Sequence, residues 1–394
     1  MNKSEFICCD CFKNIDIQNY IKSRNDIRTC SLCGKTKPVI NSTNIDLINM
    51  MRGLIRYYYP EYLYNRHCGG TDNPIDLLID ENPIIKNPKE IWKTETDDDL
   101  DSFMTIMDPT IGQNDIGYPY PLFKNGPYDR RYDIFTEPIS KEQTKWDEIL
   151  NEMESTNYND LLNKYVIWSK KIFDSNTLIL DKTSENWFRA RIGYEEKTIK
   201  NEFNSVYKIK KVYSSKNIKA PPCMIASSGR CNREGISYLY LASDINTAIA
   251  EVRPEPGHYV SIGEFQLDNT INVVNLCYTD LATLSRSLEG LEEYNLFQKI
   301  KAEFETPLTR DILNKYLKSQ FISDLIKLNG YDGLIFNSSV SDGKNLVLFD
   351  SSKAKVVPRK GKLFKIQKQR FDYGRVKNEH DGWREEYSEV IRHV

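Results

Sequence analysis

Histidine is scarce in this chain, and several other features of common protein classes are missing from it. Four histidines in 394 residues argue against a metal centre built from several imidazoles. No apolar run reaches the roughly 20 residues that span a bilayer, and the N-terminal MNKSEFICCD lacks the apolar core of a signal peptide. The formal net charge of −2 gives no general attraction to nucleic acid or membranes. We therefore expect a cytoplasmic protein with no membrane partner, and we do not expect it to bind nucleic acid.

The length of the chain exceeds what one ordinary hydrophobic core accommodates, so we expect several domains. Residues 1–40 form a small cysteine-containing, zinc-ribbon-like module, and residues 41–178 form a mainly helical domain. Residues 179–365 form a domain of mixed α+β class, and residues 366–394 form a C-terminal extension. The predicted fold class is therefore multidomain, with a zinc knuckle and an α-helical part before a C-terminal α+β domain.

The secondary-structure signals change near residue 180. Apolar residues recur at helical spacing over 42–66 and 141–173, with an irregular stretch rich in Pro, Gly and Asp at 68–140 between them. Short strand-like segments follow at 186–193, 237–242, 258–267, 271–276, 332–336 and 345–350. Two helical runs are expected between 280 and 329. The lysine-rich stretches 197–219 and 353–370 indicate solvated surface, with a docking patch for an acidic partner or nucleic acid as the weaker alternative.

Four cysteines form two close pairs near the N-terminus. Cys8 and Cys11 make the first Cys-x-x-Cys pair, and Cys30 and Cys33 make the second pair eighteen residues later. Two such pairs suit a tetrahedral Zn²⁺, because each turn presents two sulfurs to one ion. A redox role for the pairs is the alternative, but no thioredoxin-like strand precedes them. We predict a structural zinc site with these four ligands, and Cys9 is a spare thiol beside the first pair.

The segment 227–254 gathers residues that can carry chemistry. Arg230 follows a glycine and offers a planar set of donors that suits phosphate oxygens. Tyr240 lies on a strand-like segment, where an aromatic ring can stack on a cationic heterocycle. Glu251 lies among small and apolar residues, where a carboxylate is either paired or functional. Taken alone, Glu251 is more often an exposed helix residue than a catalyst.

Six segments in a fixed order resemble the RES domain family, which is called after its Arg, Glu and Ser. They are FRAR (188–191), GRCN (229–232), LYLA (239–242), AIAEV (248–252), FNSS (336–339) and NLVLF (345–349). The resemblance covers roughly residues 180–360, and the cysteine module with its helices resembles the N-terminal domain that precedes some RES domains. The chain departs from the family pattern at Asn337, where Pro is common, and at Cys231 and Asn232, where an aromatic residue often follows the Arg.

The resemblance implies a fold like that of ADP-ribosyltransferases and an enzyme that cleaves the nicotinamide–ribose bond of NAD⁺. Phosphate or water then takes the ribosyl carbon, which makes the enzyme an NAD⁺ phosphorylase or an NAD⁺ glycohydrolase. Several family members are bacterial toxins that deplete NAD⁺, and such toxins often have a neutralising antitoxin or immunity partner. The two alternatives are a protein ADP-ribosyltransferase and a non-catalytic module that binds a nucleotide or a protein partner.

The resemblance also implies roles for individual residues. The catalytic set is Glu251, Arg230, Arg189 and Ser338, and the NAD⁺-binding set is Tyr240, Arg191 and Ser339. Glu251 would stabilise the oxocarbenium-like ribose that forms as nicotinamide departs. Two of the remaining residues have a plainer alternative, in which Arg191 points to a solvated face and Ser339 is a loop hydroxyl. The choice between Ser338 and Ser339 stays open, and counting from the usual Pro position favours Ser338.

Overall fold

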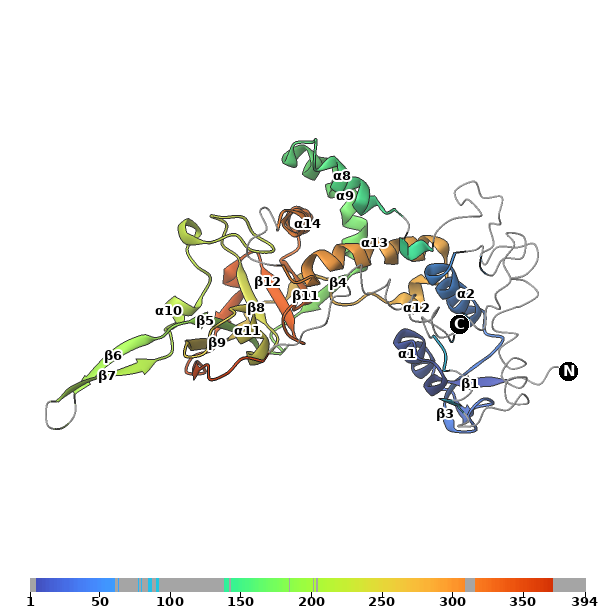
Figure 1. Cartoon of the computed structure of the whole chain (residues 1–394), viewed down its shortest axis with the longest axis horizontal. Helices are drawn as coiled ribbons and strands as arrows, with labels where there is room; N and C mark the ends of the chain where they lie inside the picture. The colour runs from blue at the N-terminus through green and yellow to red at the C-terminus, as the bar shows by residue number, and fades with distance from the viewer. Residues whose placement is uncertain are drawn as a thin grey trace, which may run out of the picture.

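The computed structural model describes residues 5–60, 138–308 and 316–370 apart from 142, 184, 201, 203 and 204, together with 63, 77, 79, 84–86, 90 and 91. The chain is elongated, with the cysteine module near one end and a large sheet toward the other, as Figure 1 shows. Helix α13 (Leu288–Glu305) runs between the two parts. Within the described residues, no helix combines the length and the hydropathy that crossing a membrane requires. Most of the stretch predicted to be irregular, 68–140, lies outside the described residues.

The N-terminal module joins a small sheet to two helices. Strands β1 (Phe6–Cys8), β3 (Thr36–Asn41) and β2 (Ile27–Thr29) pair in the order β1-β3-β2, with the turn η1 (Cys9–Cys11) after β1. Helix α1 (Ile15–Ser23) is capped by the side chain of Asn14, and α2 (Ile45–Tyr58) by that of Asn44. Pro60 is expected to end the helical pattern over 42–66, and α2 does end two residues before that proline.

The second predicted helical region is divided into two helices. Helix α8 (Lys145–Glu152) begins with a capping box between Thr144 and Asp147, and α9 (Tyr158–Ser175) begins after a turn at Asn157. Their apolar faces share one hydrophobic core with α13 and with α14 (Leu317–Leu328). The boundary predicted at 178/179 lies within β4 (Thr177–Leu180), the strand that follows α9. The division into domains stays a prediction.

The C-terminal half is built on one mixed sheet of nine strands. Its order is β13-β9-β5-β8-β12-β11-β10-β4, and β14 also pairs with β9. The strands are β4 (Thr177–Leu180), β5 (Trp187–Ile192), β8 (Leu239–Ala242), β9 (Tyr259–Leu267), β10 (Ile271–Asn275), β11 (Gly333–Asn337), β12 (Lys344–Leu348), β13 (Ala354–Val356) and β14 (Lys362–Lys365). Among the described residues, the strand pairings of this sheet are antiparallel except that of β10 with β11. All six strand-like segments of the sequence are strands, and the predicted α+β class is confirmed.

Alternating side chains on the central strands supply two cores, one on each face of the sheet. On one face, Leu334, Phe336 and Val347 pack under α9, α13 and α14. On the other face, Ile335 and Leu346 join a second apolar cluster. Shorter elements complete this half: α10 (Ser215–Ile218), η4 (Cys223–Ile225), α11 (Ile245–Glu251), α12 (Leu281–Leu284) and η5 (Ser351–Lys353).

The N-terminal module packs directly on the start of α13. Leu281 of α12 and Leu291 of α13 belong to the same buried cluster as the core of the cysteine module. Gly53 of α2 allows the closest approach, since a Cβ at this position would lie 1.9 Å from the carbonyl oxygen of Ser285. The C-terminal part of α13 then enters the core beneath the large sheet through Phe297 and other apolar residues.

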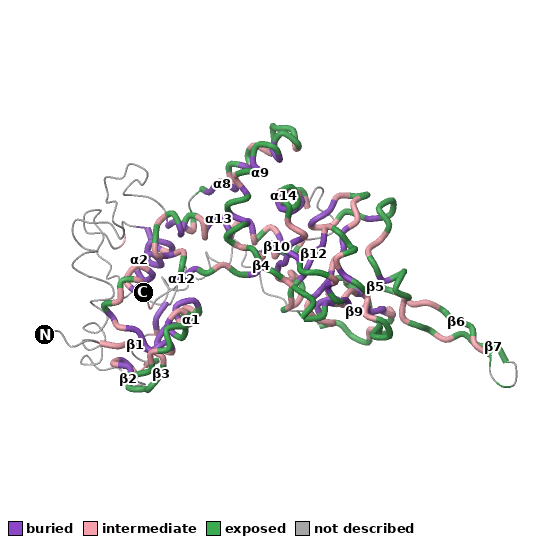
Figure 2. The backbone as a smooth tube through the Cα atoms, turned by 180° about the vertical axis from the view of Figure 1, so that it is seen from behind, coloured by how far each residue is buried: buried purple, intermediate pink, exposed green. Residues whose placement is uncertain are grey.

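Part of the lysine-rich stretch 197–219, which was predicted to be solvated surface, forms a two-stranded hairpin. Strands β6 (Glu195–Lys200) and β7 (Val206–Lys211) form a separate antiparallel ribbon that projects from the body. Figure 2 shows it without a buried stretch along its described length. The expectation of solvent exposure was therefore right for these residues, while their strand conformation was not predicted.

Candidate active site and metal centre

A cavity of about 450 Å³ opens where β5 and β8 separate. The two strands pair only at Phe188 and Ala242, and beyond that pair Arg189 and Tyr240 face the opening. The Arg189 guanidinium bridges the gap by donating from Nη1 to the carbonyl oxygen of Tyr240 at 3.0 Å. The cavity has the size of a small-molecule site. Of the predicted site residues, it is lined by Arg189, Arg230, Tyr240, Glu251 and Ser339.

Glu251 reaches the cavity from the last turn of α11. This helix begins at Asp244, whose side chain accepts a hydrogen bond from the N–H of Thr247 at 2.8 Å. The carboxylate of Glu251 is exposed to the cavity, and its Oε1 accepts two hydrogen bonds. Ser338 Oγ donates one at 2.7 Å, and Asn345 Nδ2 donates the other at 2.6 Å. Both donors point at one oxygen, which fixes the plane of the carboxylate.

Arg230 is held mainly by the end of α13. Its Nη1 donates to the carbonyl oxygen of Glu303 at 3.3 Å, and its Nη2 donates to that of Thr306 at 2.8 Å and to Ser339 Oγ at 3.0 Å. Burial lowers the pKa of the guanidinium. Arg230 therefore lines the cavity with much of its donor capacity already used by the fold.

Tyr240 is fixed by the loop that contains Arg230. Its hydroxyl donates to Asn232 Oδ1 at 2.6 Å and accepts from the N–H of Cys231 at 3.0 Å. Burial raises the pKa of this tyrosine well above its ordinary value, so the hydroxyl stays neutral. A Cβ at Gly229 would lie 2.9 Å from the Tyr240 oxygen, which explains why the close approach uses glycine. The ring is thus presented to the cavity while its hydroxyl is engaged inside.

Asn232 departs from the family pattern, and the structure shows what it does. Its Nδ2 lies within hydrogen-bond distance of the carbonyl oxygens of Ser227, Arg233 and Ile236, at 2.8 to 3.0 Å. Gln320 of α14 adds donors to the same loop, including one to the carbonyl oxygen of Gly229 at 2.9 Å. The amide of Asn232 therefore connects three backbone carbonyl groups of this turn.

Arg189 lies at the back of the cavity with part of its guanidinium unsatisfied. Its Nε is buried and has no hydrogen-bond partner within the described part of the chain. Burial, with a smaller effect of the neighbouring Arg191, lowers the pKa of Arg189 to about 10. The group therefore remains charged at neutral pH. A buried cation with an unused donor is suited to a bound anion.

The structure does not bring every predicted site residue to the cavity. Arg191 donates to the carbonyl oxygen of Asn217 at 2.6 Å and lies over the Tyr213 ring at 5.0 Å, outside the cavity lining. Ser338 touches Glu251 but does not line the cavity, whereas Ser339 lines it and contacts Arg230. The two serines thus support different groups, and the roles assigned to all of these residues stay predictions.

The cavity-lining residues that the sequence analysis missed include Asn345, Tyr316 and Arg253. Asn345 opens the strand-like segment NLVLF, and a polar residue at the first buried position of an apolar strand is the signal that could have identified it. Its side chain is 7% exposed. Tyr316 and Arg253 carry no comparable sequence signal, because their place depends on how distant segments meet.

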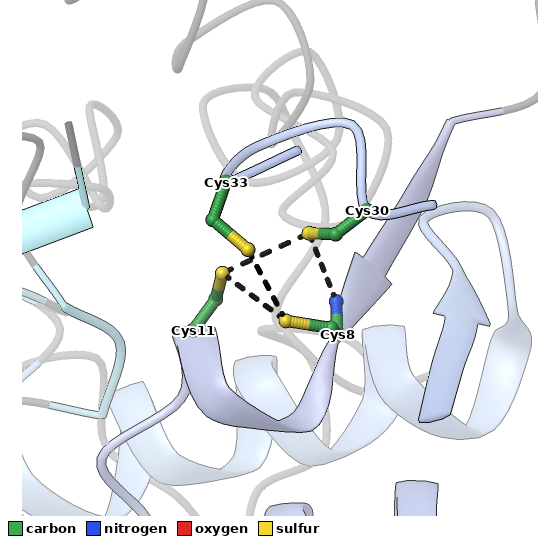
Figure 3. A group of neighbouring side chains, drawn as sticks. All are labelled: Cys8, Cys11, Cys30 and Cys33. Carbon is green, nitrogen blue, oxygen red and sulfur yellow. Dashed lines mark hydrogen bonds between the residues drawn. The ribbon is translucent and has the colours of Figure 1, made fainter. Parts of the chain in front are cut away.

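The four predicted zinc ligands form one cluster in the N-terminal module, as Figure 3 shows. The Cys8 sulfur lies 3.6 Å from that of Cys11 and 3.5 Å from that of Cys33, and Cys11 lies 3.8 Å from Cys30. A tetrahedral ion with Zn–S bonds of ~2.3 Å places its sulfurs ~3.8 Å apart, so the cluster fits such an ion. The cluster could hold zinc.

The surroundings of the cluster also fit a metal centre. The backbone N–H of Cys8 donates to the Cys30 sulfur at 3.2 Å, which is a contact that favours a thiolate. The neighbouring Cys30 and Cys8 thiols, together with burial, raise the pKa of Cys11. Four crowded thiols therefore resist losing their protons together until a cation compensates the charge. Cys9 lies outside the cluster and donates to Asp10 Oδ1 at 3.4 Å.

Comparison with known families agrees with the motifs around the cavity. A family model described as "RES domain" matches residues 206–373. The findings thus support a RES domain over residues 206–373. The matched range contains Arg230, Tyr240, Glu251 and both serines, while Arg189 precedes it on β5, a strand of the same sheet.

Comparisons with curated proteins and with solved structures give little further information about this chain. No curated protein matches the chain. One similar solved structure is the crystal structure of the M. tuberculosis MbcT–MbcA toxin–antitoxin complex, with 11% identity and a TM-score of 0.28. The match covers 50% of this chain and 91% of that chain. A likeness this weak says nothing about ligands or partners.

Proposed function

We propose that the RES domain binds NAD⁺ and cleaves the bond between nicotinamide and ribose, with phosphate or water as acceptor. The observation that supports this most is the setting of Glu251. Its carboxylate is oriented by two hydrogen bonds to a single oxygen and faces a cavity that also presents arginines and a tyrosine ring. Such a combination suits a dinucleotide that carries two phosphates and a cationic ring.

The chemistry needs a group that stabilises positive charge on the ribose. As the bond between C1′ and the nicotinamide nitrogen breaks, its electron pair goes to the ring and nicotinamide leaves neutral. The ribose is left oxocarbenium-like, and the Glu251 carboxylate stabilises it. Ser338 and Asn345 both bond Oε1, so Oε2 is the oxygen left to face the substrate.

The acceptor then completes the reaction. An oxygen of phosphate or water forms the new bond to C1′, and a water molecule loses one proton in doing so. Tyr240 would hold the nicotinamide ring by stacking, with its own ring fixed through Asn232. Arg189 and Arg230 would bind the diphosphate or an incoming phosphate, since both line the cavity.

Incubation of the purified full chain with NAD⁺, with and without inorganic phosphate, tests the proposal. Nicotinamide release is followed by NMR or chromatography, with Glu251→Gln as the matched control. Release that requires phosphate identifies a phosphorylase, and release without phosphate identifies a glycohydrolase. If wild type and variant both release nothing in either condition, the proposal fails. Transfer of ADP-ribose to protein would then be tested with labelled NAD⁺, and nucleotide binding without turnover by calorimetry.

The cellular consequence of this activity is depletion of NAD⁺, so we propose that the protein acts as a toxin or defence effector. Expression of wild-type protein should then arrest its host, whereas Glu251→Gln should be tolerated at equal protein levels. Equal growth with both forms would contradict this part of the proposal. A neutralising partner stays a prediction, which co-purification from the native host would test.

We further propose that Zn²⁺ occupies the four-cysteine cluster as a structural ion. Four sulfur ligands leave no open coordination position, so the ion would stabilise the module and take no part in the reaction at the cavity. The cluster shares its core with α12 and α13, which gives the ion an indirect influence on the RES domain.

A further inference from the structure

Arg253 has an unusual backbone for an arginine. It follows the end of α11 by two residues and has a φ of +47°, in the left-handed region that favours glycine. It also precedes Pro254, and the proline ring restricts the conformations of the residue before it. Glycine would adopt this backbone with less strain. Arginine is therefore less favourable than glycine for the backbone conformation at this position.

The side chain of Arg253 lines the same cavity as Glu251 and Arg230. It is exposed, and within the described part of the chain its guanidinium makes no hydrogen bond or ion pair. This distinguishes it from Arg230, whose guanidinium contacts three oxygens of the fold. It also differs from Arg189, which bonds a backbone carbonyl at the back of the cavity. Of the three arginines, Arg253 has the most donors free for a ligand.

The charges around the cavity are unbalanced. Three arginines and one glutamate are the charged residues in its lining, which gives a net charge of +2 from three positive groups and one negative group. The diphosphate of a dinucleotide carries two negative charges and can accept several charge-assisted hydrogen bonds. Much of the donor capacity of Arg230 is used in hydrogen bonds to the fold. Arg253 adds a cation with free donors that can bind the phosphates beside Arg189.

We propose that Arg253 binds the diphosphate of the dinucleotide and is the main determinant of affinity for that part of the substrate. The inference rests on the proposed function, since it assigns a residue of the same site. It predicts that the Arg253 side chain contributes to ligand binding and contributes nothing to the stability of the fold.

Two variants of Arg253 and one control separate ligand binding from folding. Arg253→Gly removes the charge and the backbone strain together, and Arg253→Lys keeps a charge. Arg359 provides a matched control, because it is also exposed with a positive φ of +62°, but it lies outside the cavity lining. Arg359→Gly therefore removes the same charge and a similar strain away from the site.

Calorimetric titration of the full-length proteins with ADP-ribose and, separately, with nicotinamide measures the effect. ADP-ribose carries the diphosphate without the leaving ring, and nicotinamide carries neither phosphate. Arg253→Gly should weaken ADP-ribose binding about tenfold to a hundredfold, leave nicotinamide binding unchanged and leave the melting temperature equal or higher. Arg253→Lys should recover part of the affinity, and Arg359→Gly should bind ADP-ribose as wild type does.

The outcomes that overturn the inference differ from those that overturn the proposed function. If Arg253→Gly binds ADP-ribose as tightly as wild type, the inference is wrong while NAD⁺ cleavage by wild type can still stand. If the variant loses affinity only because its melting temperature falls, Arg253 is a structural residue and the inference is again wrong. If wild type binds neither NAD⁺ nor ADP-ribose, the proposed function fails and the inference fails with it.

Discussion

Asn345 donates a hydrogen bond from Nδ2 to Glu251 Oε1 across 2.6 Å. The asparagine lies at the start of β12, next to Ala242 of β8 and Phe336 of β11, so its side chain is anchored in the middle of the sheet. The glutamate lies at the end of a short helix and is exposed to the cavity. The bond therefore connects an exposed side chain at the end of a short helix to a strand that is paired on both sides within the sheet.

Replacement of Asn345 should lower turnover more than it lowers stability. Asn345→Ala leaves the Glu251 carboxylate with Ser338 as its donor, and a hydrogen bond to a charged group contributes ~1.5–3 kcal/mol. If the bond acts mainly in the transition state, kcat falls roughly tenfold to hundredfold while KM changes little. Steady-state kinetics of nicotinamide release, with the melting temperature measured in parallel, check this. A kcat within twofold of wild type would contradict it.

Asn345→Asp gives the same position a pH-dependent donor. While the introduced carboxyl is protonated it can donate to Glu251, and once it ionises the two carboxylates repel each other. The variant should thus be most active at mildly acidic pH and should lose activity as the pH rises, in a range where wild type does not. A pH–rate profile parallel to that of wild type would show that Asn345 does not act through its donor.

Two variants of Tyr240 separate its ring from its hydroxyl. Tyr240→Phe keeps the ring but leaves Asn232 Oδ1 and the Cys231 N–H without their partner, which should cost ~1–3 kcal/mol of unfolding free energy. Its KM for NAD⁺ should stay within a few fold of wild type. Tyr240→Leu removes the ring and should raise KM more strongly. Denaturant unfolding and kinetics on both variants check this, and equal KM values for the two would exclude stacking.

The sequence predicted the parts of this molecule that depend on local pattern. The short spacing within each Cys-x-x-Cys pair places its two sulfurs close together. The cluster of Cys8, Cys11, Cys30 and Cys33 could therefore be predicted from spacing. Apolar runs bounded by polar turns located the strands of the large sheet. The hairpin of β6 and β7 was missed because charged residues, Glu and Lys together, make up more than half of its strands and leave few apolar positions to mark their period.

Which residues line the cavity depends on contacts between segments that are distant in the sequence, and the sequence analysis predicted this less well. The family resemblance assigned both Arg189 and Arg191 to the ligand site, and two residues that lie two apart on one strand are expected to share a face. The structure holds Arg191 against Asn217 and Tyr213, from a segment that covers β5 beyond the cavity. Arg253 was missed for a similar reason, because its positive φ and its place at the cavity follow from how α11 ends.

Metal content distinguishes the cysteine cluster from its neighbour Cys9. Wild type and Cys9→Ser should each contain about one zinc per chain, because Cys9 lies outside the cluster and serine keeps a donor for Asp10. Cys11→Ser should lose the metal and melt several degrees lower, since the buried core around the cluster loses its central support. Elemental analysis and thermal melts check this. Wild type without zinc after purification with zinc supplied, or zinc retained by Cys11→Ser alone, would contradict the assignment.

The contact between Asp16 of the N-terminal module and Tyr278 of the C-terminal half should make the stability of the junction between these two parts depend on pH. Its Oδ1 accepts from the Tyr278 hydroxyl at 2.6 Å, and burial raises the pKa of its carboxyl above the ordinary value of 3.8 despite that bond. The folded protein therefore binds a proton that the unfolded chain has lost, and unfolding free energy falls as the pH rises from about 4 through the raised pKa. Asp16→Asn stays neutral and can still accept from Tyr278. It should be more stable than wild type at pH 7, because it avoids the cost of a buried negative charge, and should match wild type at or below pH 4. Denaturant unfolding at both pH values checks this, and a variant less stable than wild type at pH 7 would show that the charge of Asp16 stabilises the junction.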